Sequence, residues 1–237
     1  MDKELISLLD SYKMPDSAVE LLQKARVAFV VGVSGAGKNT ILKELLKTGK
    51  YRLIISHTTR RPRENHGVLE LDGQDYHFID QNIAGSMLKN NEFIEAKIYS
   101  ENVYGTSLEE VEKAYAEGKI AISDIEVQGV SEYMKISSFV TPVFILPPDF
   151  DTWQKRLRVR YAGKQPDESD MRKRMETAKK ELEEALSKDY FEFVINDELS
   201  RAVAAVDEIA HGKLSAEKND QARIVAKNLL NRLSQHS

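Results

Sequence analysis

A glycine-rich turn between a buried strand and a helix constrains this sequence more than any other feature. The segment Gly32-Val33-Ser34-Gly35-Ala36-Gly37-Lys38-Asn39-Thr40 follows the apolar run 27–31 and leads into a helical pattern over 40–46. Its glycines let several backbone N–H groups point inward, the helix N-terminus adds a partial positive charge, and Lys38 adds a full one. This order of strand, turn and helix predicts a phosphate-binding loop that opens an α/β fold.

The loop predicts an ATP site. The residues expected to bind the nucleotide phosphates are Ser34, Gly35, Ala36, Gly37, Lys38, Asn39 and Thr40. The alternative is a plain glycine turn without a ligand, but a lysine directly after Gly37 favours phosphate binding. Asn39 stands where such loops usually carry a Ser or Thr ligand for magnesium, and its amide oxygen can ligate Mg2+ directly or through water.

Composition excludes several other classes of protein. The chain has 237 residues, of which 41% are apolar and 30% charged, a formal net charge of −4 and no cysteine. It can therefore bury a core, but it has no disulfides, thiolate metal sites or thiol nucleophile. The acidic balance argues against nucleic acid and anionic membranes as partners, and no apolar run is long enough for a membrane span. We expect a soluble, cytoplasmic protein.

The rest of the chain predicts a parallel sheet flanked by helices, with two interruptions. Further strands are expected at 53–55, 120–125, 140–146 and 193–195. A polar, turn-rich stretch at about 56–106 predicts an inserted lobe, and a basic stretch at about 155–175 predicts a lid. Amphipathic patterns predict helical extensions at 1–25 and 213–237 around a domain of 26–212. We expect the extensions to pack on the core or on a second subunit, and a homodimer is one expected partner.

Positive charge gathers in two places outside the loop. One is Arg60-Arg61-Pro62-Arg63, and the other runs from Lys155 and Arg156 to Arg160. Each cluster alone is more simply a solvated face with carboxylate partners. In an acidic chain that also has a phosphate loop, the guanidinium groups favour contacts to phosphate.

Seven ordered motifs resemble the guanylate kinase family. They are Ser56-His57-Thr58-Thr59-Arg60-Arg61-Pro62-Arg63, Asp75-Tyr76-His77-Phe78, Asn91-Glu92-Phe93-Ile94-Glu95, Tyr104-Gly105-Thr106, Asp124-Ile125-Glu126-Val127-Gln128-Gly129, Ile145-Leu146-Pro147-Pro148 and Val194-Ile195-Asn196-Asp197. The match extends from about residue 27 to about residue 209. The resemblance implies a P-loop NTPase core, a GMP-binding lobe and a lid, and an enzyme that phosphorylates GMP or dGMP with ATP and Mg2+.

The resemblance also implies roles for individual residues. For the phosphate of GMP it implies Ser56, Arg60, Arg63 and Tyr76, with Tyr104 lining the site, and for the guanine it implies Glu95, Thr106 and Glu126. Asp124 is implied near the magnesium, and Asn196 on the adenine side of the ATP site. Lys38, Arg156, Arg160 and Arg174 are implied as catalytic residues that contact the transferring phosphoryl group. Guanine offers N1–H and 2-amino donors that adenine lacks, so two carboxylates suit it.

Four departures from the family pattern are visible. The segment between Arg63 and Tyr76 is longer than usual and lacks the Gly-Glu that normally follows the second arginine, and the stretch 161–169 is longer. Val103 stands where a first tyrosine often precedes Tyr104, and Glu126 replaces a common aspartate. Two other functions stay open: a related kinase with another phosphate acceptor, and a non-catalytic protein-binding module of the same fold. The paired acids argue against the first, and the intact lysine and arginines argue against the second.

Overall fold

The computed structural model describes residues 2–65, 67–160 and 168–236, and these form two compact units. Unit 1 contains residues 1–25 and 52–121, and unit 2 contains residues 26–51 and 122–237. The segment predicted as an N-terminal extension therefore groups with the segment predicted as the inserted lobe. The predicted lid segment falls partly outside the described residues.

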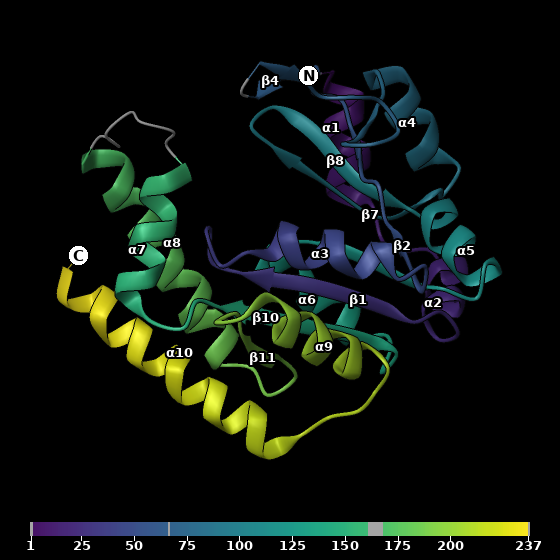
Figure 1. The fold of residues 1–237 in the computed structure, drawn as a ribbon. Helices are drawn as coiled ribbons and strands as arrows, with labels where there is room; N and C mark the ends of the chain where they lie inside the picture. The colour runs from purple at the N-terminus through teal and green to yellow at the C-terminus, as the bar shows by residue number, and fades with distance from the viewer. Residues whose placement is uncertain (1, 66, 161–167, 237) are drawn as a thin grey trace. The chain divides into compact units, whose positions relative to one another are not determined.

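A five-stranded sheet has the strand order β11-β10-β1-β9-β2 (Figure 1), and most of its residues belong to unit 2, while residues 52–53 and 120–121 belong to unit 1. Its strands are β1 (Val27–Gly32), β2 (Tyr51–Leu53), β9 (Ile120–Asp124), β10 (Val140–Leu146) and β11 (Glu192–Ile195). β1 pairs with β10 and β10 with β11, both in parallel. Every residue of β1 is buried, as expected for a continuous apolar strand covered on both faces. The predicted parallel sheet flanked by helices is confirmed.

Helices cover both faces of this sheet. α3 (Lys38–Lys47) and α9 (Leu199–Ala210) contact each other on one face, and α6 (Val127–Met134) and α8 (Glu168–Leu186) lie on the other (Figure 1). α7 (Phe150–Arg160) follows β10, and α10 (Ala216–His236) packs on α8 and β11. Parallel strands need such crossover helices, and the helices bury the two apolar faces of the sheet.

α10 is a helix in the segment where the sequence predicts a C-terminal helical extension, with an expected apolar stripe of Ile224, Val225, Leu229, Leu230 and Leu233. Leu229 and Leu233 are buried as expected, whereas Ile224 is 59% exposed. The buried side of the helix includes Ala222 and Ala226 instead. Small side chains at these positions let α10 lie close to its neighbours, so the packing face is rotated from the one that the larger residues indicate.

Unit 1 is built on a four-stranded sheet with the order β6-β3-β8-β7. The strands are β3 (His57–Thr58), β6 (His77–Phe78), β7 (Phe93–Tyr99) and β8 (Asn102–Ser107), and a separate hairpin joins β4 (Glu64–Asn65) to β5 (Val68–Leu69). Its helices are α1 (Lys3–Ser11), α2 (Asp16–Leu22), α4 (Gln81–Lys89) and α5 (Leu108–Ala116). The two predicted amphipathic segments near the N-terminus are thus helices, the first with Asp2 as its N-cap.

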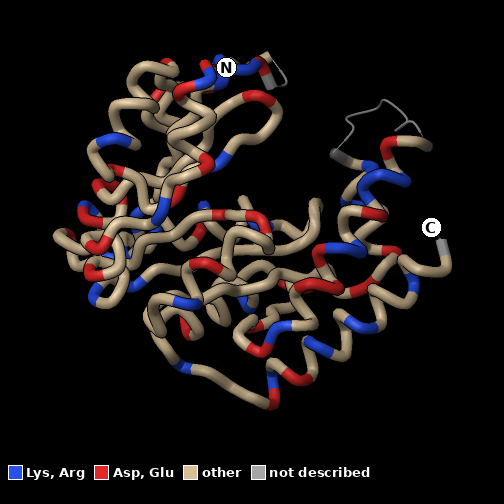
Figure 2. The backbone as a smooth tube through the Cα atoms, turned by 180° about the vertical axis from the view of Figure 1, so that it is seen from behind, with Lys and Arg blue, Asp and Glu red and all other residues tan. Residues whose placement is uncertain are grey.

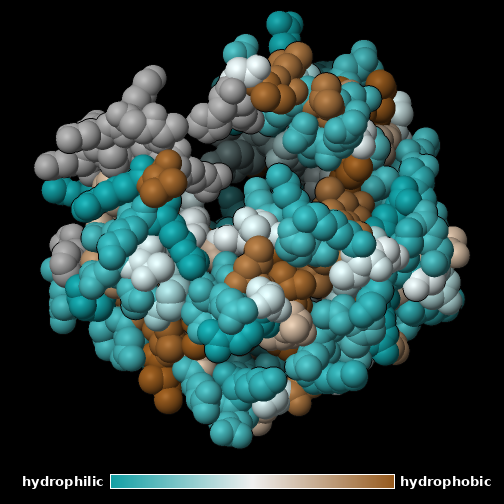
Figure 3. Space-filling model, in the orientation of Figure 1, coloured by the Kyte–Doolittle hydropathy of each residue, from teal (hydrophilic) through white to brown (hydrophobic). Residues whose placement is uncertain are grey.

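Most of the visible surface is hydrophilic. Figure 3 shows apolar side chains as separate groups between polar ones. Charged residues of both signs lie on α10, with the acids in its first turns and only basic residues along the rest (Figure 2), which agrees with a solvent-facing side opposite its buried stripe. Within the described residues, no helix is long and apolar enough to cross a membrane.

Candidate active site

The predicted phosphate loop joins β1 to α3 in unit 2. Gly37 adopts φ +97°, which favours glycine, and a Cβ atom at this position would collide with the side-chain amide of Asn196. The Asn196 Nδ2 atom donates to the Ala36 carbonyl oxygen at 2.7 Å. Asn196, predicted on the ATP side from a distant motif, therefore lies against the loop and holds its backbone.

Two side chains from the helices α7 and α8 form hydrogen bonds with Ser34 of the loop. The Trp153 Nε1 atom donates to the Ser34 carbonyl oxygen at 2.8 Å, and the Arg174 Nη1 atom donates to the Ser34 hydroxyl at 3.3 Å. Trp153 is fully buried, and it belongs to none of the sequence motifs described above. The sequence does not reveal this hydrogen bond, because 119 residues separate Trp153 from Ser34.

A cavity of about 630 Å3 opens beside the loop. Its lining residues are Gly35, Gly37, Lys38, Asn39, Thr40, Arg156, Val159, Asn196, Asp197 and Leu199. Arg156 donates from Nη2 to the Asn196 carbonyl oxygen at 2.9 Å, and Lys38 donates from Nζ to the Gly32 carbonyl oxygen. The structure thus gathers most of the predicted ATP-binding residues around one cavity with basic groups on its wall.

Glu181 of α8 is a titratable group near this loop that sequence reasoning missed. Burial raises the pKa of its carboxyl to about 7, the nearby Lys38 charge opposes that rise, and Glu126 adds to it. Nothing in the local sequence distinguishes Glu181 from the other acids of α8. Only its half-buried place in unit 2 sets it apart.

Asp124 and Glu126 follow the neighbouring strand of the same sheet. β9 lies beside β1 in the strand order, Asp124 is its last residue, and Glu126 is the N-cap residue of α6. Both side chains are exposed. In α/β sheets, the carboxyl ends of the strands are the usual place for ligands, and both acids lie at such an end.

In unit 1, Arg60 forms the centre of a cluster with Tyr76 and Tyr104. The guanidinium of Arg60 lies 5.2 Å from the centroid of the Tyr76 ring, and its Nε atom donates to the Tyr104 hydroxyl at 3.2 Å. The two tyrosine rings meet edge to face with centroids 5.9 Å apart. Two residues predicted at the GMP phosphate and the tyrosine predicted to line the same site come from separate motifs and are in contact.

Glu70 completes this cluster and was missed in the sequence. Arg60 donates to both carboxylate oxygens of Glu70, at 2.7 and 3.0 Å, and the backbone N–H of Arg63 donates to Glu70 at 2.8 Å. The hydrogen bond to Arg60 lowers the pKa of the Glu70 carboxyl. The signal that could have found it is the Gly67 turn followed by Val68 and Leu69, which returns the chain toward the arginines as a hairpin.

Glu95 and Thr106 face each other on neighbouring strands. They are paired in the register of β7 with β8, and the Thr106 hydroxyl donates to Glu95 Oε1 at 3.1 Å. The pairing shifts by one residue between Phe93 and Glu95, which marks a β-bulge. Bulges re-aim side chains, so the direction of Glu95 depends on this local irregularity.

The remaining predicted residues are placed less completely. Ser56 accepts from the His77 backbone N–H through its carbonyl oxygen at 2.9 Å and is half-buried, while Arg63 is exposed. Arg160 ends α7, and its side chain lies outside the described residues, as do residues 161–167 of the lid predicted at 155–175. Glu126 belongs to unit 2 and the other guanine residues to unit 1, so its role toward the base stays a prediction.

Comparisons with known proteins identify the family of the chain. Residues 24–212 match the family model of guanylate kinase. The guanylate kinase of Schizosaccharomyces pombe is 35% identical over 189 residues, which cover 78% of this chain and 90% of that protein. The guanylate kinase of Sus scrofa is 34% identical over 186 residues, covering 77% of this chain and 90% of that one. The chain belongs to the guanylate kinase family.

Two other comparisons agree with membership of the guanylate kinase family. Guanylate kinase 1 of Oryza sativa subsp. japonica is 38% identical over 173 residues, which are 72% of this chain but 44% of the longer rice protein. The crystal structure of guanylate kinase from Anaplasma phagocytophilum has a TM-score of 0.56 at 20% identity and covers 87% of this chain and 96% of its own. At that identity the crystal structure supports the fold alone. In this guanylate kinase, α1 and α10 lie outside residues 24–212, the part matched by the family model.

Proposed function

We propose that this guanylate kinase transfers the γ-phosphoryl group of ATP to GMP or dGMP through the residues described above, giving ADP and the corresponding diphosphate. The observation that carries the proposal is the phosphate loop, with Lys38 on the wall of a cavity of about 630 Å3. The acceptor is already an anionic phosphate oxygen, so the reaction needs no general base. It needs neutralised charge and in-line positioning.

On the donor side, the loop N–H groups and Lys38 hold the ATP phosphates. Asn196 donates to the Ala36 carbonyl oxygen on the side assigned to the adenine, and Arg174 donates to the Ser34 hydroxyl of the same loop. Arg156 and Arg160 are assigned to the transferring phosphoryl group together with Arg174. Positive groups at this point stabilise the charge that spreads over the equatorial oxygens in a loose transition state.

The donor set at the carboxyl end of the sheet fits magnesium. Among the described residues, no group of three or more His, Asp and Glu could hold a metal by protein ligands alone. Mg2+ usually takes one or two protein oxygens plus substrate phosphates and water. Asn39 and Asp124 are exposed oxygen ligands of this kind, and they would hold the ion, which when bound neutralises phosphate charge.

On the acceptor side, Arg60 and Tyr76 are assigned to the phosphate of GMP with Ser56 and Arg63, and Tyr104 lines the same site. Glu70 orients the Arg60 guanidinium through two parallel hydrogen bonds. The carboxylate fixes the orientation of the guanidinium and offsets part of its charge.

Glu95, Thr106 and Glu126 are assigned to the guanine. Carboxylates accept from N1–H and the 2-amino group, and an adenine in their place would leave acceptors unpaired. Such a mismatch supports rejection by orders of magnitude. A homodimer and the cytoplasm remain predictions from the sequence.

The test is a coupled assay of ADP release with GMP, dGMP, AMP, UMP and CMP as acceptors. The expected result is turnover with GMP or dGMP and a value of kcat/KM for AMP lower by at least about a thousandfold. Glu95→Gln should raise KM for GMP and leave KM for ATP unchanged. Equal turnover of AMP, or a Glu95→Gln effect on ATP instead, would overturn the assignment of the guanine site.

A further inference from the structure

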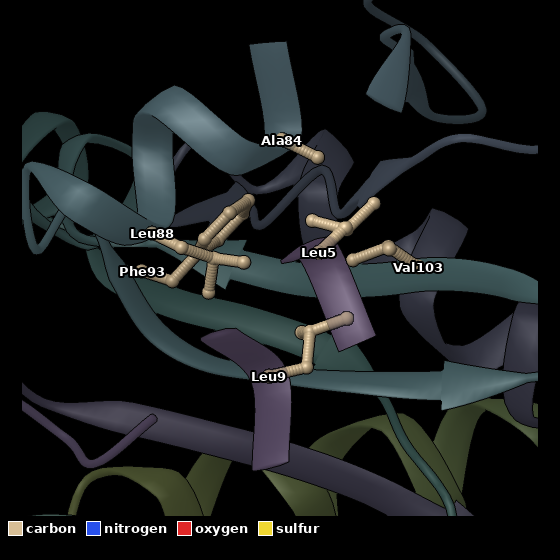
Figure 4. Packing of buried hydrophobic residues seen from close by; sticks show 6 residues of the cluster. All are labelled: Leu5, Leu9, Ala84, Leu88, Phe93 and Val103. Carbon is tan, nitrogen blue, oxygen red and sulfur yellow. The ribbon is translucent and has the colours of Figure 1, made fainter. Parts of the chain in front are cut away.

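The helix α1 lies outside the residues matched to the family, yet it packs on the strand that carries Glu95. Leu5 and Leu9 of α1 form one buried cluster with side chains from α4, β7 and β8 (Figure 4). The cluster consists of Leu5, Leu9, Ala84, Leu88, Phe93 and Val103. α1 is therefore an integral layer of unit 1, and its apolar side covers the sheet beside the proposed guanine site.

A hydrogen bond ties the end of α1 to the start of β7. Tyr12, the C-cap residue, donates from its hydroxyl to the Phe93 carbonyl oxygen at 2.7 Å. Burial raises the pKa of the Tyr12 hydroxyl, so it remains a protonated donor. The contact falls at the residue where the register shift toward Glu95 begins. It thus anchors one side of the bulge that aims Glu95.

The ring of Phe93 links this anchor to β8. Phe93 is fully buried, and a Cβ atom at Gly105 would lie 2.8 Å from its ring carbons. Gly105 stands between Tyr104 and Thr106, both assigned to the GMP site. Because there is no free space at this contact, a shift of Phe93 would move the backbone of β8 as well as that of β7.

The polar contacts near the start of α1 contribute less than the buried leucines and Tyr12. Glu4 pairs with Lys89 at 2.7 Å, and the Asp2 backbone N–H donates to the Gln81 side chain at 3.2 Å. These groups are exposed, and exposed pairs contribute little to stability. The buried leucines and Tyr12 are the contacts that matter for the position of β7.

We propose that α1 is a positioning element for guanine recognition: Leu5, Leu9 and Tyr12 fix the bulge of β7 so that Glu95 and Thr106 are aligned to receive the base. The inference rests on the proposed role of Glu95 in binding guanine. α1 itself touches no substrate. Its loss would weaken recognition of GMP without changing the ATP site in unit 2.

The central test is Tyr12→Phe, which removes only the hydroxyl. We expect KM for GMP to rise about fivefold, the size of effect for one net hydrogen bond, with kcat and KM for ATP unchanged. The matched control is Tyr115→Phe, which removes a hydroxyl from an exposed tyrosine of α5 and should change neither constant. Leu9→Ala should also raise KM for GMP, and its thermal unfolding shows how much folded enzyme remains.

Two comparisons separate positioning from a purely structural role. If Tyr12→Phe lowers Tm but leaves KM for GMP unchanged, α1 only stabilises the unit and the proposal is wrong. In a double-mutant cycle with Glu95→Gln, the double variant should have nearly the same KM for GMP as Glu95→Gln alone, because both act through one carboxylate. If the increases in KM for GMP caused by Tyr12→Phe and Glu95→Gln multiply in the double variant, the proposal is wrong.

The same cycle distinguishes failure of the inference from failure of the proposed function. If Glu95→Gln raises KM for GMP and Tyr12→Phe does not, the site assignment stands and the role of α1 is rejected. If Glu95→Gln itself leaves KM for GMP unchanged, the guanine site is misassigned and the inference falls with it.

Discussion

At the scale of single residues, the phosphate loop shows how many contacts one functional side chain depends on. Lys38 is the first residue of α3 and donates back to the Gly32 carbonyl oxygen at the end of β1. This hydrogen bond connects the two ends of the loop through the lysine side chain. Its charge is available to phosphate while the backbone around it is fixed by Asn196 and Trp153.

Lys38→Ala should reduce kcat by about a hundredfold or more, as expected when one contact to transition-state charge is lost. The side chain lines a cavity, so its removal should leave the fold intact. Steady-state kinetics with saturating GMP measures the loss, and Tm checks the fold. Lys43→Ala, on the exposed side of the same helix, is the control for removing a positive charge, and equal activity of the two variants would contradict the assignment.

His57 gives the protein an acid-sensitive point in unit 1. It is buried, its ring lies 4.6 Å from that of His77, and its Nδ1 atom is buried without a partner in the described structure. Burial, together with the His77 charge, lowers the pKa of His57 to about 4, while Glu109 and Glu110 oppose the shift. In the unfolded chain the pKa is about 6.5.

Between these two pKa values the unfolded state binds more protons than the folded state, so the free energy of unfolding falls as pH falls from about 6.5 to about 4. Above that window the contribution is constant. His57→Gln should therefore show a smaller loss of Tm between pH 6.5 and 4.5 than the wild type, whatever its Tm at neutral pH. His211→Gln, at an exposed histidine, is the control, and parallel Tm curves for wild type and His57→Gln would contradict the prediction.

At the scale of elements, the sequence revealed the long buried pieces and missed the short ones. β1 was predictable because it is a continuous apolar run, β10 because it ends in the apolar run 143–146, and α10 because its leucines recur with helical spacing. β3 and β6 have two residues each, too few for a period, and they pair only because distant segments meet. The β4–β5 hairpin was missed for a related reason. Its strands also have two residues each, and the contact of Glu70 with Arg60 forms only in the folded chain.

Glu70→Gln should lower Tm by about 5 °C or more in the absence of nucleotide, because the buried Arg60 guanidinium loses its carboxylate partner. A phosphate dianion at Arg60 would restore an opposite charge. We therefore expect saturating GMP to raise Tm more in the variant than in the wild type. Glu64→Gln, an exposed acid of the same hairpin, is the control, and an equal GMP increment in wild type and Glu70→Gln would show that Arg60 does not contact the GMP phosphate.

At the scale of the whole molecule, the two segments beyond the family match have different neighbours. α1 packs within unit 1 on the strand that carries Glu95, whereas α10 packs within unit 2 on α8, α7 and the sheet. Both were predicted to cover apolar surface, and both do so within this chain. The sequence could show that each helix has an apolar side, but not which strand that side would cover.

The C-terminal helix should stabilise unit 2 without affecting substrate choice. Leu229 is buried, the Asn219 side chain accepts from the Phe193 backbone N–H at 2.9 Å, and Arg223 donates to the Lys188 and Phe191 carbonyl oxygens. α10 thus covers β11, the strand at one end of the sheet order. An uncovered edge strand would expose apolar side chains and unpaired backbone groups.

Leu229→Ala should therefore destabilise the protein by about 2–4 kcal/mol, the usual cost of emptying a buried leucine site, while the ratio of kcat/KM for GMP to that for AMP stays at the wild-type value. Leu230→Ala, one position further along the same helix and only partly buried, is the matched control with a smaller expected cost. Urea unfolding measures the stability, and the coupled assay measures the ratio below the unfolding transition. Because α10 makes these contacts in unit 2 and Glu95 lies in unit 1, a fall in guanine preference in Leu229→Ala would show that the C-terminal helix, like α1, contributes to recognition of the base.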